Sequence, residues 1–356
     1  MEELGFKGRK MAGIIGYGVY IPLYRIKTED IANVWGRDVD VVKSGLLINE
    51  KSVPCIDEDT VTMGIEASLN AIKRADINPE EIGAIYSGSE TPAYAVKPNI
   101  SIISNAIGMG PRHLGADVEF ACKAGTAALQ MIMGLVSSNI VKYGLAIGAD
   151  TGEYYAENIG DQSSSAGSAA FILGNNPKEI VAEIKETLSF TSDVPDFWRR
   201  PQARYPTHAE KFTAEPAYFK HTITATKLIM EKVGIKPSEV DHVVFHTPNG
   251  KFPLKVAKTL GFTKEQMKAG FVVDKIGNTY SAASLIGLAS VLDVAEPGEN
   301  IILTSFGSGA GSDAFYIKVT DAIKEKRDMA KTTKYYIDRK KYIDYATYCK
   351  YTNKIE

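Results

Sequence analysis

Short apolar runs alternate with longer stretches of mixed polarity along most of the chain. Runs such as HVVFH, YGLAIGAD and NIILTSFG have the length and the Val, Ile and Leu content of buried β-strands. The stretches between them are long enough for helices. Strands that alternate with helices of this length predict parallel β/α units, in which helices cover both faces of a sheet. The predicted fold class is therefore α/β.

The pattern also repeats within the chain. Residues 75–88 read ADINPEEIGAIYSG and residues 233–246 read VGIKPSEVDHVVFH, an offset of 158. Further on, GSAAFIL from Gly167 matches GSDAFYI from Gly311, and the offset has fallen to 144. Insertions therefore separate the two copies, notably the polar and aromatic stretch from Thr187 to Phe219. A duplicated half explains the length of the chain without two unrelated domains.

Two related halves, residues 1–175 and 176–356, would stack as helix, sheet, helix, sheet, helix. The helices that begin after Cys122 and Asn278 would then be symmetry mates, buried between the sheets with their N-termini close together. Their sequences are rich in Gly, Ala and Ser as well as apolar residues, which suits helices covered on all sides.

Composition and charge narrow the class of protein further. The 356 residues carry a formal net charge of −2, so no general attraction to nucleic acid or to an anionic membrane is expected. No apolar run reaches the roughly 18 residues of a membrane-spanning helix. The three cysteines are too few and too scattered for a disulfide framework, which favours a reducing, cytoplasmic compartment. The true start of the chain could be Met1 or Met11.

The C-terminal tail, residues 321–356, is the local exception in charge. It carries ten Lys and Arg against six Asp and Glu, a balance of +4, among many tyrosines. A solvated terminal surface and a partner-docking segment are both compatible with this composition.

Cys122 lies where a strand turns into a helix, in FACKAGTAA. Unpaired backbone N–H groups and the helix dipole at such a turn favour a thiolate, and can lower a cysteine pKa from about 8.5 to between roughly 3.5 and 7.5. A buried and inert cysteine is the alternative. The small neighbours of Cys122 favour the nucleophile.

His246 and Glu90 occupy matching positions in the two halves. His246 ends the strand-like HVVFH, at the carboxyl edge where open α/β sheets place their sites. The repeat sets His246 opposite Gly88, two residues before Glu90. Glu90 is therefore predicted at the corresponding edge of the other sheet, although a carboxylate there could also be a solvated loop residue.

Asn278 and Ser308 are further polar candidates. Asn278, in GNTYSAAS, mirrors the start of the Cys122 helix, and could cap its own helix or present its amide to a substrate carbonyl. Ser308 lies in SFGSGAGSDAF, where a tight turn follows a strand. The turn could supply oxyanion-hole donors or be a plain hairpin turn.

Cys122 in CKAGT, His246 in HTPNGK and Asn278 in GNTYSAAS resemble the Cys-His-Asn set of the thiolase superfamily. Initiating ketoacyl-acyl-carrier-protein synthases share this set but form their carbanion by decarboxylation. Hydroxymethylglutaryl-CoA synthases deprotonate an acetyl methyl group and need a glutamate, which Glu90 would supply. From Gly13 to about Val319 the chain looks most like the archaeal type of this synthase, particularly in DFWRRPQARYPTHAEKFTAEPAYFKH, GDQSSSAGSAAF and HTPNGKFPLKVAKTLG.

The resemblance implies a thiolase-like fold with duplicated βαβαβαββ halves in a five-layer αβαβα sandwich. It implies an acyltransferase of the mevalonate route to isoprenoids. Cys122 would carry an acetyl group from acetyl-CoA, Glu90 would remove a methyl proton, and the carbanion would add to acetoacetyl-CoA. His246 would protonate the ketone oxygen, and water would release hydroxymethylglutaryl-CoA. No metal or redox cofactor is implied.

The resemblance also implies residues that contact the substrates. Asn278 and Ser308 would lie at the acyl oxygens, and the other implied contacts to substrate or CoA are Asp38, Val39, Ser163, Thr213, Lys251 and Lys255.

The family further implies a homodimer, and for the archaeal type an assembly with acetoacetyl-CoA thiolase and a small scaffold protein with an OB-fold and a zinc ribbon. Two other interpretations stay open. One is a ketoacyl synthase III-like enzyme that uses malonyl thioesters, and the other is a catalytically silent thiolase-fold subunit that acts as a scaffold.

Overall fold

The computed structural model describes residues 12–152, 154–209 and 212–355. Met1 and Met11, the two possible starts, lie outside these residues. The first half of the chain contains β1 (Gly13–Tyr20), β2 (Tyr24–Lys27), α1 (Thr28–Val34), α2 (Val39–Leu46), β3 (Glu50–Val53), α3 (Thr60–Ala75), β4 (Ile82–Gly88), α4 (Asn99–Ala106), β5 (Leu114–Val118), α5 (Ala124–Ser137), β6 (Tyr143–Thr151) and β7 (Ala166–Gly174).

The second half follows a similar order, with additional elements and with a short helix in place of β5. It contains β8 (Ala182–Val194), β9 (Phe197–Trp198), β10 (Thr207–His208), the π-helical turn η4 (Thr213–Phe219), α7 (Lys220–Val233), β11 (His242–Phe245), α8 (Lys251–Leu260), α9 (Lys264–Lys268), α10 (Val273–Ile276), α11 (Ala283–Leu292), β12 (Asn300–Thr304) and β13 (Gly309–Val319). The tail forms α12 (Ile323–Lys326), α13 (Thr333–Asp338), β14 (Lys341–Tyr342) and α14 (Tyr345–Tyr351).

The strands of the two halves pair in the same way. In the first half β4 is parallel to β5 and β6, whereas β6 with β7 and β7 with β1 are antiparallel. In the second half β11 is parallel to β12, and β12 with β13 and β13 with β8 are antiparallel. The predicted duplication is thus confirmed at the level of strand direction.

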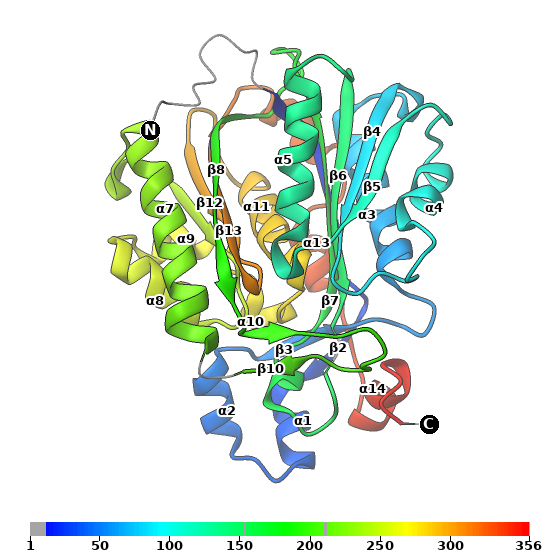
Figure 1. Ribbon diagram of the computed structural model, residues 1–356, viewed down its shortest axis with the longest axis vertical. Helices are drawn as coiled ribbons and strands as arrows, with labels where there is room; N and C mark the ends of the chain where they lie inside the picture. Colours follow the sequence, from blue (N-terminus) through cyan, green and yellow to red (C-terminus); the bar gives the residue numbers. More distant parts are fainter. Residues whose placement is uncertain (1–11, 153, 210–211, 356) are drawn as a thin grey trace.

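Five layers are visible in Figure 1, where α5 and α11 lie between the two half-sheets, with α3 and α4 outside one of them and α7 and α8 outside the other. The half-sheets also touch at one edge. A short antiparallel pairing, with Gly13 opposite Glu183 and Ile14 opposite Ala182, joins them into one nine-stranded ladder. The thiolase-like sandwich is confirmed, with the addition of this junction.

The second half departs from the duplicated βαβαβαββ order that the resemblance implies at its third strand. The segment FVVDKIGN, which corresponds in sequence to the β5 region, forms the short helix α10 instead of a strand. The backbone N–H of Asn49 donates to Asp274 O (2.9 Å), and Ser52 Oγ donates to Ile276 O (3.2 Å). Contacts beside the small sheet β14-β2-β3 therefore occupy the backbone that a strand would pair, and the described residues of the second half contribute four strands to the nine-stranded ladder.

The predicted insertion, residues 187–219, begins too early, because residues 187–194 belong to β8 and pair with β13. The chain leaves the sheet only after Val194 and then forms the β9–β10 hairpin and η4. Pro216 lies inside η4 and cannot donate a backbone hydrogen bond, which suits a widened helical turn. Several side chains of this insertion line the cavity described below.

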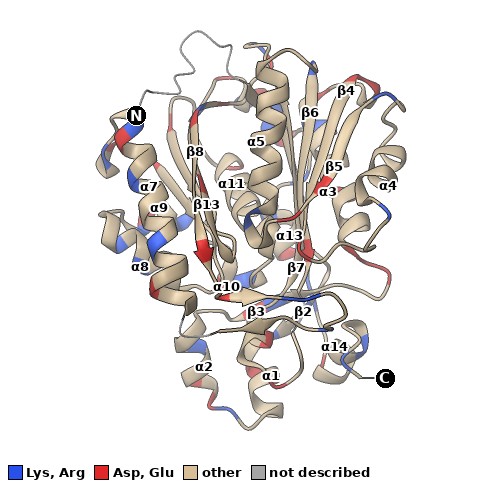
Figure 2. Cartoon of the chain, viewed as in Figure 1, with Lys and Arg blue, Asp and Glu red and all other residues tan. Residues whose placement is uncertain are grey.

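The basic tail is part of the folded structure. Strand β14 pairs with β2, and Tyr336, Tyr348 and Cys349 are buried. Most other described residues of the tail are exposed or partly exposed, as the expectation of a solvated terminal surface had it, but these three side chains anchor the tail to the first half. Figure 2 shows basic and acidic positions interspersed over the outer helices. None of the described helices combines the length and the hydrophobicity that crossing a bilayer requires.

Candidate active site

Cys122 and Glu90 lie side by side at the junction of the two halves. Cys122 is in a 3₁₀ turn, Ala121–Lys123, that leads into α5, and its side chain is buried. Its Sγ lies 3.8 Å from Glu90 Oε1 and 3.9 Å from Oε2, and donates a hydrogen bond to the carboxylate. Glu90 follows the carboxyl end of β4, as the repeat predicted.

Burial raises the pKa of both groups of this pair. Desolvation raises the pKa of the Cys122 thiol well above its usual value, and the negative charge of Glu90 adds to the effect. Desolvation also raises the pKa of Glu90 well above its usual value, with Asp150 contributing in the same direction. The expectation that Cys122 has a lowered pKa is therefore wrong for the free enzyme, because burial and a neighbouring carboxylate outweigh the helix start.

His246 directly follows β11 and is almost fully buried. Its backbone is held from two sides, since its N–H donates to Thr304 O (3.0 Å) and its carbonyl accepts from the Tyr218 hydroxyl (2.6 Å). Its ring Nδ1 has no hydrogen-bond partner within the described part of the chain. Desolvation lowers the pKa of His246 to about 3, so the imidazole is neutral at physiological pH.

Cys122 and His246 open into one cavity of about 170 Å³. Four other predicted residues also line it, namely Ser163, Thr213, Asn278 and Ser308. Much of the remaining wall is aromatic, from Tyr154, Phe197, Tyr218, Phe252, Tyr280 and Phe306.

Glu90 faces a second, wider cavity of about 900 Å³ between β4 and the insertion. Arg199 and Arg200 also line this space, and Phe197, Tyr280 and Ser308 line both cavities. The Cys122–Glu90 pair therefore lies at the wall between two cavities, with a route from each.

Asn278 is held in place by its own backbone and side chain. Its N–H donates to Ser163 O (2.7 Å), and its Oδ1 accepts from the backbone N–H of Tyr280 (2.9 Å). The amide thus caps the turn that leads into α11, as one of the two expectations had it. The symmetry mate of Cys122 is, however, Ser281, because the turn Tyr280–Ala282 precedes α11 as Ala121–Lys123 precedes α5.

The other predicted contacts lie outside the cavity wall. Asp38 caps α2 by accepting from Val41 N–H (3.0 Å), and Val39 begins that helix. Leu46, at the C-terminal end of α2, does line the cavity. At a rise of 1.5 Å per residue it lies about 10 Å along the helix from Val39. Lys251 begins α8 two residues after the cavity-lining Asn249, and Lys255 is paired with Glu215 (2.6 Å).

Asp150 was missed by the sequence reasoning. It is fully buried near the end of β6, and its Oδ1 accepts from Ser89 Oγ (2.8 Å) and from the backbone N–H groups of Glu90 (2.9 Å) and Thr91 (3.0 Å). Its Oδ2 accepts from the N–H of Ser281 (2.8 Å). One carboxylate therefore fixes both the Glu90 loop and the start of α11. A charged residue at the carboxyl end of a buried strand was the available signal.

A stacked pair of half-sheets with a buried cysteine at the start of a central helix defines a condensing enzyme of the thiolase superfamily. A family model for the 3-oxoacyl-[acyl-carrier-protein (ACP)] synthase III C terminal matches residues 230–319. Hydroxymethylglutaryl-CoA synthases from Methanocaldococcus jannaschii and Archaeoglobus fulgidus are 55% and 54% identical to the chain over 346 residues, which is 97% of this chain and 100% of each relative. The chain belongs to the hydroxymethylglutaryl-CoA synthase family.

Solved structures agree with this fold. The structure of MvaS in complex with 3-hydroxy-3-methylglutaryl coenzyme A matches with a TM-score of 0.87 at 21% identity, over 97% of this chain and 92% of that one. A crystal structure of an HMG-CoA synthase complexed with CoA matches with a TM-score of 0.85 at 23% identity, over 96% and 90%.

Proposed function

We propose that the chain condenses acetyl-CoA with acetoacetyl-CoA and water to 3-hydroxy-3-methylglutaryl-CoA and CoA, the reaction for which its close relatives are named. The observation that carries the mechanism is the Cys122–Glu90 pair, with Sγ within 3.9 Å of both carboxylate oxygens. A nucleophile and a base at this separation serve both acyl transfer and proton abstraction.

In the first step Cys122 attacks the thioester carbonyl of acetyl-CoA. Because burial keeps Cys122 protonated, its proton passes to the Glu90 carboxylate as the S–C bond forms. Collapse of the tetrahedral intermediate breaks the bond to CoA sulfur, and the proton returns to that sulfur as CoA leaves. The raised pKa of Glu90 brings it closer to that of a thiol, which favours transfer in both directions.

In the second step Glu90 removes a proton from the methyl group of acetyl-Cys122. The thioester acidifies that methyl group, and the resulting carbanion adds to the ketone carbon of acetoacetyl-CoA. His246 enters as a neutral imidazole, since its pKa is about 3, and donates a hydrogen bond to the ketone oxygen as negative charge develops there. The proton that Glu90 removed then passes to this alkoxide, which becomes the hydroxyl of the product. Water then hydrolyses the Cys122 thioester, which restores the thiol and releases the product.

The substrate contacts follow the path from the cavity outward. Ser163, Thr213, Asn278 and Ser308 line the cavity and would contact the acyl and pantetheine groups. Lys251 and Lys255 on α8 would meet the pantetheine or the phosphates. Asp38 and Val39, at the N-terminal end of α2, would contact the nucleotide end of CoA.

A second candidate function is a ketoacyl synthase III-like condensation with malonyl thioesters, which the family-model match over residues 230–319 favours. That chemistry needs no carboxylate base, because loss of CO₂ generates the carbanion. The contact between Glu90 and Cys122 Sγ counts against it. The silent scaffold is disfavoured because Cys122, His246 and Asn278 share a cavity.

The test is turnover of acetyl-CoA plus acetoacetyl-CoA by the wild type, Glu90→Gln and Glu81→Gln. Glu81 is a suitable control, because its carboxylate pairs with Lys142 on the surface at the other end of β4. Loss of the general base should lower turnover by about 10²- to 10⁴-fold in Glu90→Gln alone. Turnover that is indifferent to Glu90, or that requires a malonyl thioester, would assign the chain to the ketoacyl branch.

We further propose a cytoplasmic enzyme of the mevalonate route that forms a homodimer. The edge strand β5 is exposed, with Leu114 at 47% exposure, and is available for pairing with a second copy. An assembly with acetoacetyl-CoA thiolase and a small OB-fold, zinc-ribbon scaffold protein would pass on acetoacetyl-CoA directly. Co-purification of the three proteins, with and without cross-linking, would test the assembly.

A further inference from the structure

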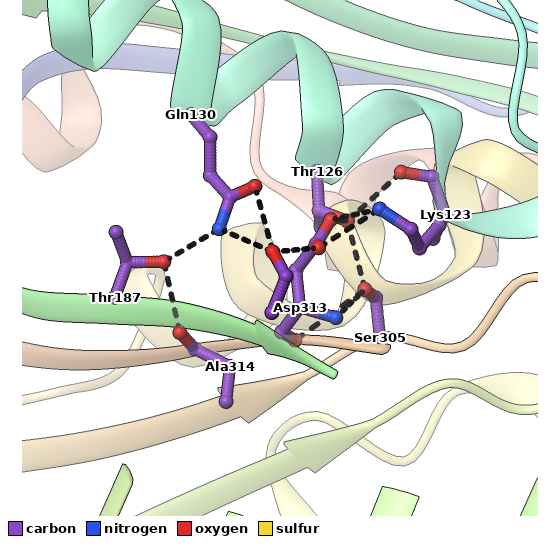
Figure 3. Close-up of polar contacts among 8 residues, drawn as sticks. Lys123, Thr126, Gln130, Thr187, Ser305, Asp313 and Ala314 are labelled. Atoms are coloured by element: carbon purple, nitrogen blue, oxygen red, sulfur yellow. Dashed lines mark hydrogen bonds and ion pairs between the residues drawn. The ribbon is translucent and has the colours of Figure 1, made fainter. Parts of the chain in front are cut away.

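A buried ion pair joins the turn of Cys122 to the opposite half of the molecule. Lys123, the residue after Cys122, is only 4% exposed, and its Nζ lies 2.9 Å and 3.1 Å from the two carboxylate oxygens of Asp313 on β13. Asp313 is fully buried. Figure 3 shows Lys123 from the turn before α5, and Thr126 and Gln130 from α5, directed toward the strands of the second half.

Each oxygen of Asp313 has a second donor. Thr126 Oγ1 donates to Oδ2 (2.8 Å), and Ser189 Oγ donates to Oδ1 (2.7 Å). Thr126 Oγ1 also lies 2.8 Å from the Ser305 hydroxyl, which extends the network to the end of β12. Such a fully satisfied buried network fixes geometry more tightly than apolar packing does.

The turn between β12 and β13 packs directly on the turn that carries Cys122. A Cβ added to Gly307 would lie 2.5 Å from Phe120 O, and one added to Gly311 would lie 2.8 Å from the Phe120 ring. Gly307 and Gly311 close the turn through a pair of backbone hydrogen bonds (2.8 and 2.9 Å). Ser308, which lines both cavities, lies inside this turn.

We propose that the Lys123–Asp313 pair is a positioning device that holds Cys122 at a fixed place relative to the Ser308 turn, so that acyl transfer to Cys122 depends on it. A buried ion pair gives little net stability, because desolvation offsets the attraction, whereas its geometry is specific. The pair joins residues 190 positions apart in sequence, one from each half. The acetyl-transfer part of this inference rests on the proposed function.

The test compares two double variants of the full chain. Lys123→Met with Asp313→Asn removes both charges and leaves an acceptor for Thr126 and Ser189. The control, Arg74→Met with Asp293→Asn, removes another buried pair (3.8 Å) that lies outside both cavities. Single-turnover acetylation of Cys122 by acetyl-CoA should fall about 100-fold in the first variant, as expected for a small misplacement of a reacting group, and remain near wild type in the control. KM for acetyl-CoA should change little in either.

Two further measurements separate the possible failures. Ser189→Ala removes one hydrogen-bond donor to Asp313, and because Ser189 is exposed this variant should fold normally. Its acetylation should be slowed less than that of the double variant. Alkylation of Cys122 by iodoacetamide reports its placement without any synthase chemistry, and should change in the Lys123→Met, Asp313→Asn variant but not in the control. If the wild type is alkylated but never acetylated, the proposed function fails, and the alkylation rates of the variants still test whether the ion pair positions Cys122. Acetylation and alkylation at wild-type rates in the Lys123 variant, or equal losses in the control, would overturn the inference.

Discussion

At the scale of single residues, burial controls the charge of the groups at the junction. His246 is held neutral, with a pKa of about 3, because its ring is removed from water without a charged partner among the described residues. The same desolvation raises the pKa of both Cys122 and Glu90. The carboxylate of Glu90 raises that of Cys122 further, whereas the hydrogen bond from Cys122 lowers that of Glu90. A neutral donor, a thiol and a strengthened base are the protonation states that the proposed steps use.

The low pKa of His246 predicts a loss of stability in acid. The unfolded chain takes up a proton on this histidine below its ordinary pKa of 6.5, whereas the folded chain takes it up only near pH 3. The free energy of unfolding therefore falls as the pH drops through this window, by about 1.6 kcal/mol between pH 6.5 and pH 5, because the slope approaches 1.36 kcal/mol per pH unit only well below pH 6.5. His246→Asn should lack this part of the loss in urea unfolding at the two pH values. Equal losses in both proteins would contradict a buried, neutral His246.

Single residues were predicted from the sequence where the repeat could be used. Glu90 and His246 were found because the strands that precede them match. Asp150 could not be found in this way, because its donors, Ser89 and Ser281, lie 61 and 131 positions away and converge only in the folded chain. The direction of the Cys122 pKa shift was mispredicted for the same reason, since both the burial of the thiol and the neighbouring carboxylate are produced by the fold.

At the scale of elements, the starts of the two central helices meet at the junction. Ala121 and Tyr280, which precede Cys122 and Ser281, both adopt a positive φ, 42° and 52°. Each such residue costs of order 1–3 kcal/mol, so the packing around the two turns must hold them. Gly125 on α5 makes this approach possible, because a Cβ there would lie 2.6 Å from Ser281 O.

Gly125→Ala should therefore destabilise the protein and lower its activity. The added methyl would force the two helix starts apart, at a cost of about 1–3 kcal/mol for overpacking. Gly134→Ala in the same helix is the matched control, because a Cβ there meets nothing within 4 Å. It should be stabilising by about 0.4–1 kcal/mol through the unfolded state. Denaturant unfolding and Cys122 acetylation measure both effects. Similar behaviour of the two variants would argue against a tight junction.

The elements themselves were predictable wherever a local pattern recurred in both halves. The exception is α10, which corresponds to β5 in the internal repeat. Its backbone is bound by the small sheet that β2, β3 and β14 form. That sheet contains chain segments hundreds of residues apart, and no local pattern announces such a pairing.

At the scale of the whole molecule, the C-terminal tail supports the cavity wall. Asp161 lies in the short helix Ile159–Gln162, whose Ile159 and Gly160 line the cavity. Its carboxylate accepts from the Tyr348 hydroxyl, and lies 3.4 Å from Lys51 Nζ and 3.2 Å from Lys354 Nζ. Composition could describe the tail as basic and Tyr-rich but could not indicate this buried cluster. The boundary of the halves between residues 175 and 176 stays a prediction.

A chain that ends at Asp344 should consequently lose part of its substrate binding. Without Tyr348 and Lys354, the buried Asp161–Lys51 pair loses partners, at a cost of about 1–3 kcal/mol for each unsatisfied group. KM for acetyl-CoA should rise more than kcat falls, and limited proteolysis should cut first near residues 155–163. Lys350→Met, an exposed change on the same helix, is the control. An unchanged KM in the truncated chain would refute a supporting role of the tail.

The central claim is that Cys122 carries the acetyl group, and the most direct measurement is its covalent adduct. Wild-type enzyme is incubated with acetyl-CoA alone, digested and analysed by mass spectrometry, and a parallel sample then receives acetoacetyl-CoA. We predict one acetyl group on the peptide that contains Cys122, none on those with Cys55 or Cys349, and its discharge as hydroxymethylglutaryl-CoA on addition of the second substrate. Acetylation at another residue, or turnover that persists in Cys122→Ser, would contradict the account.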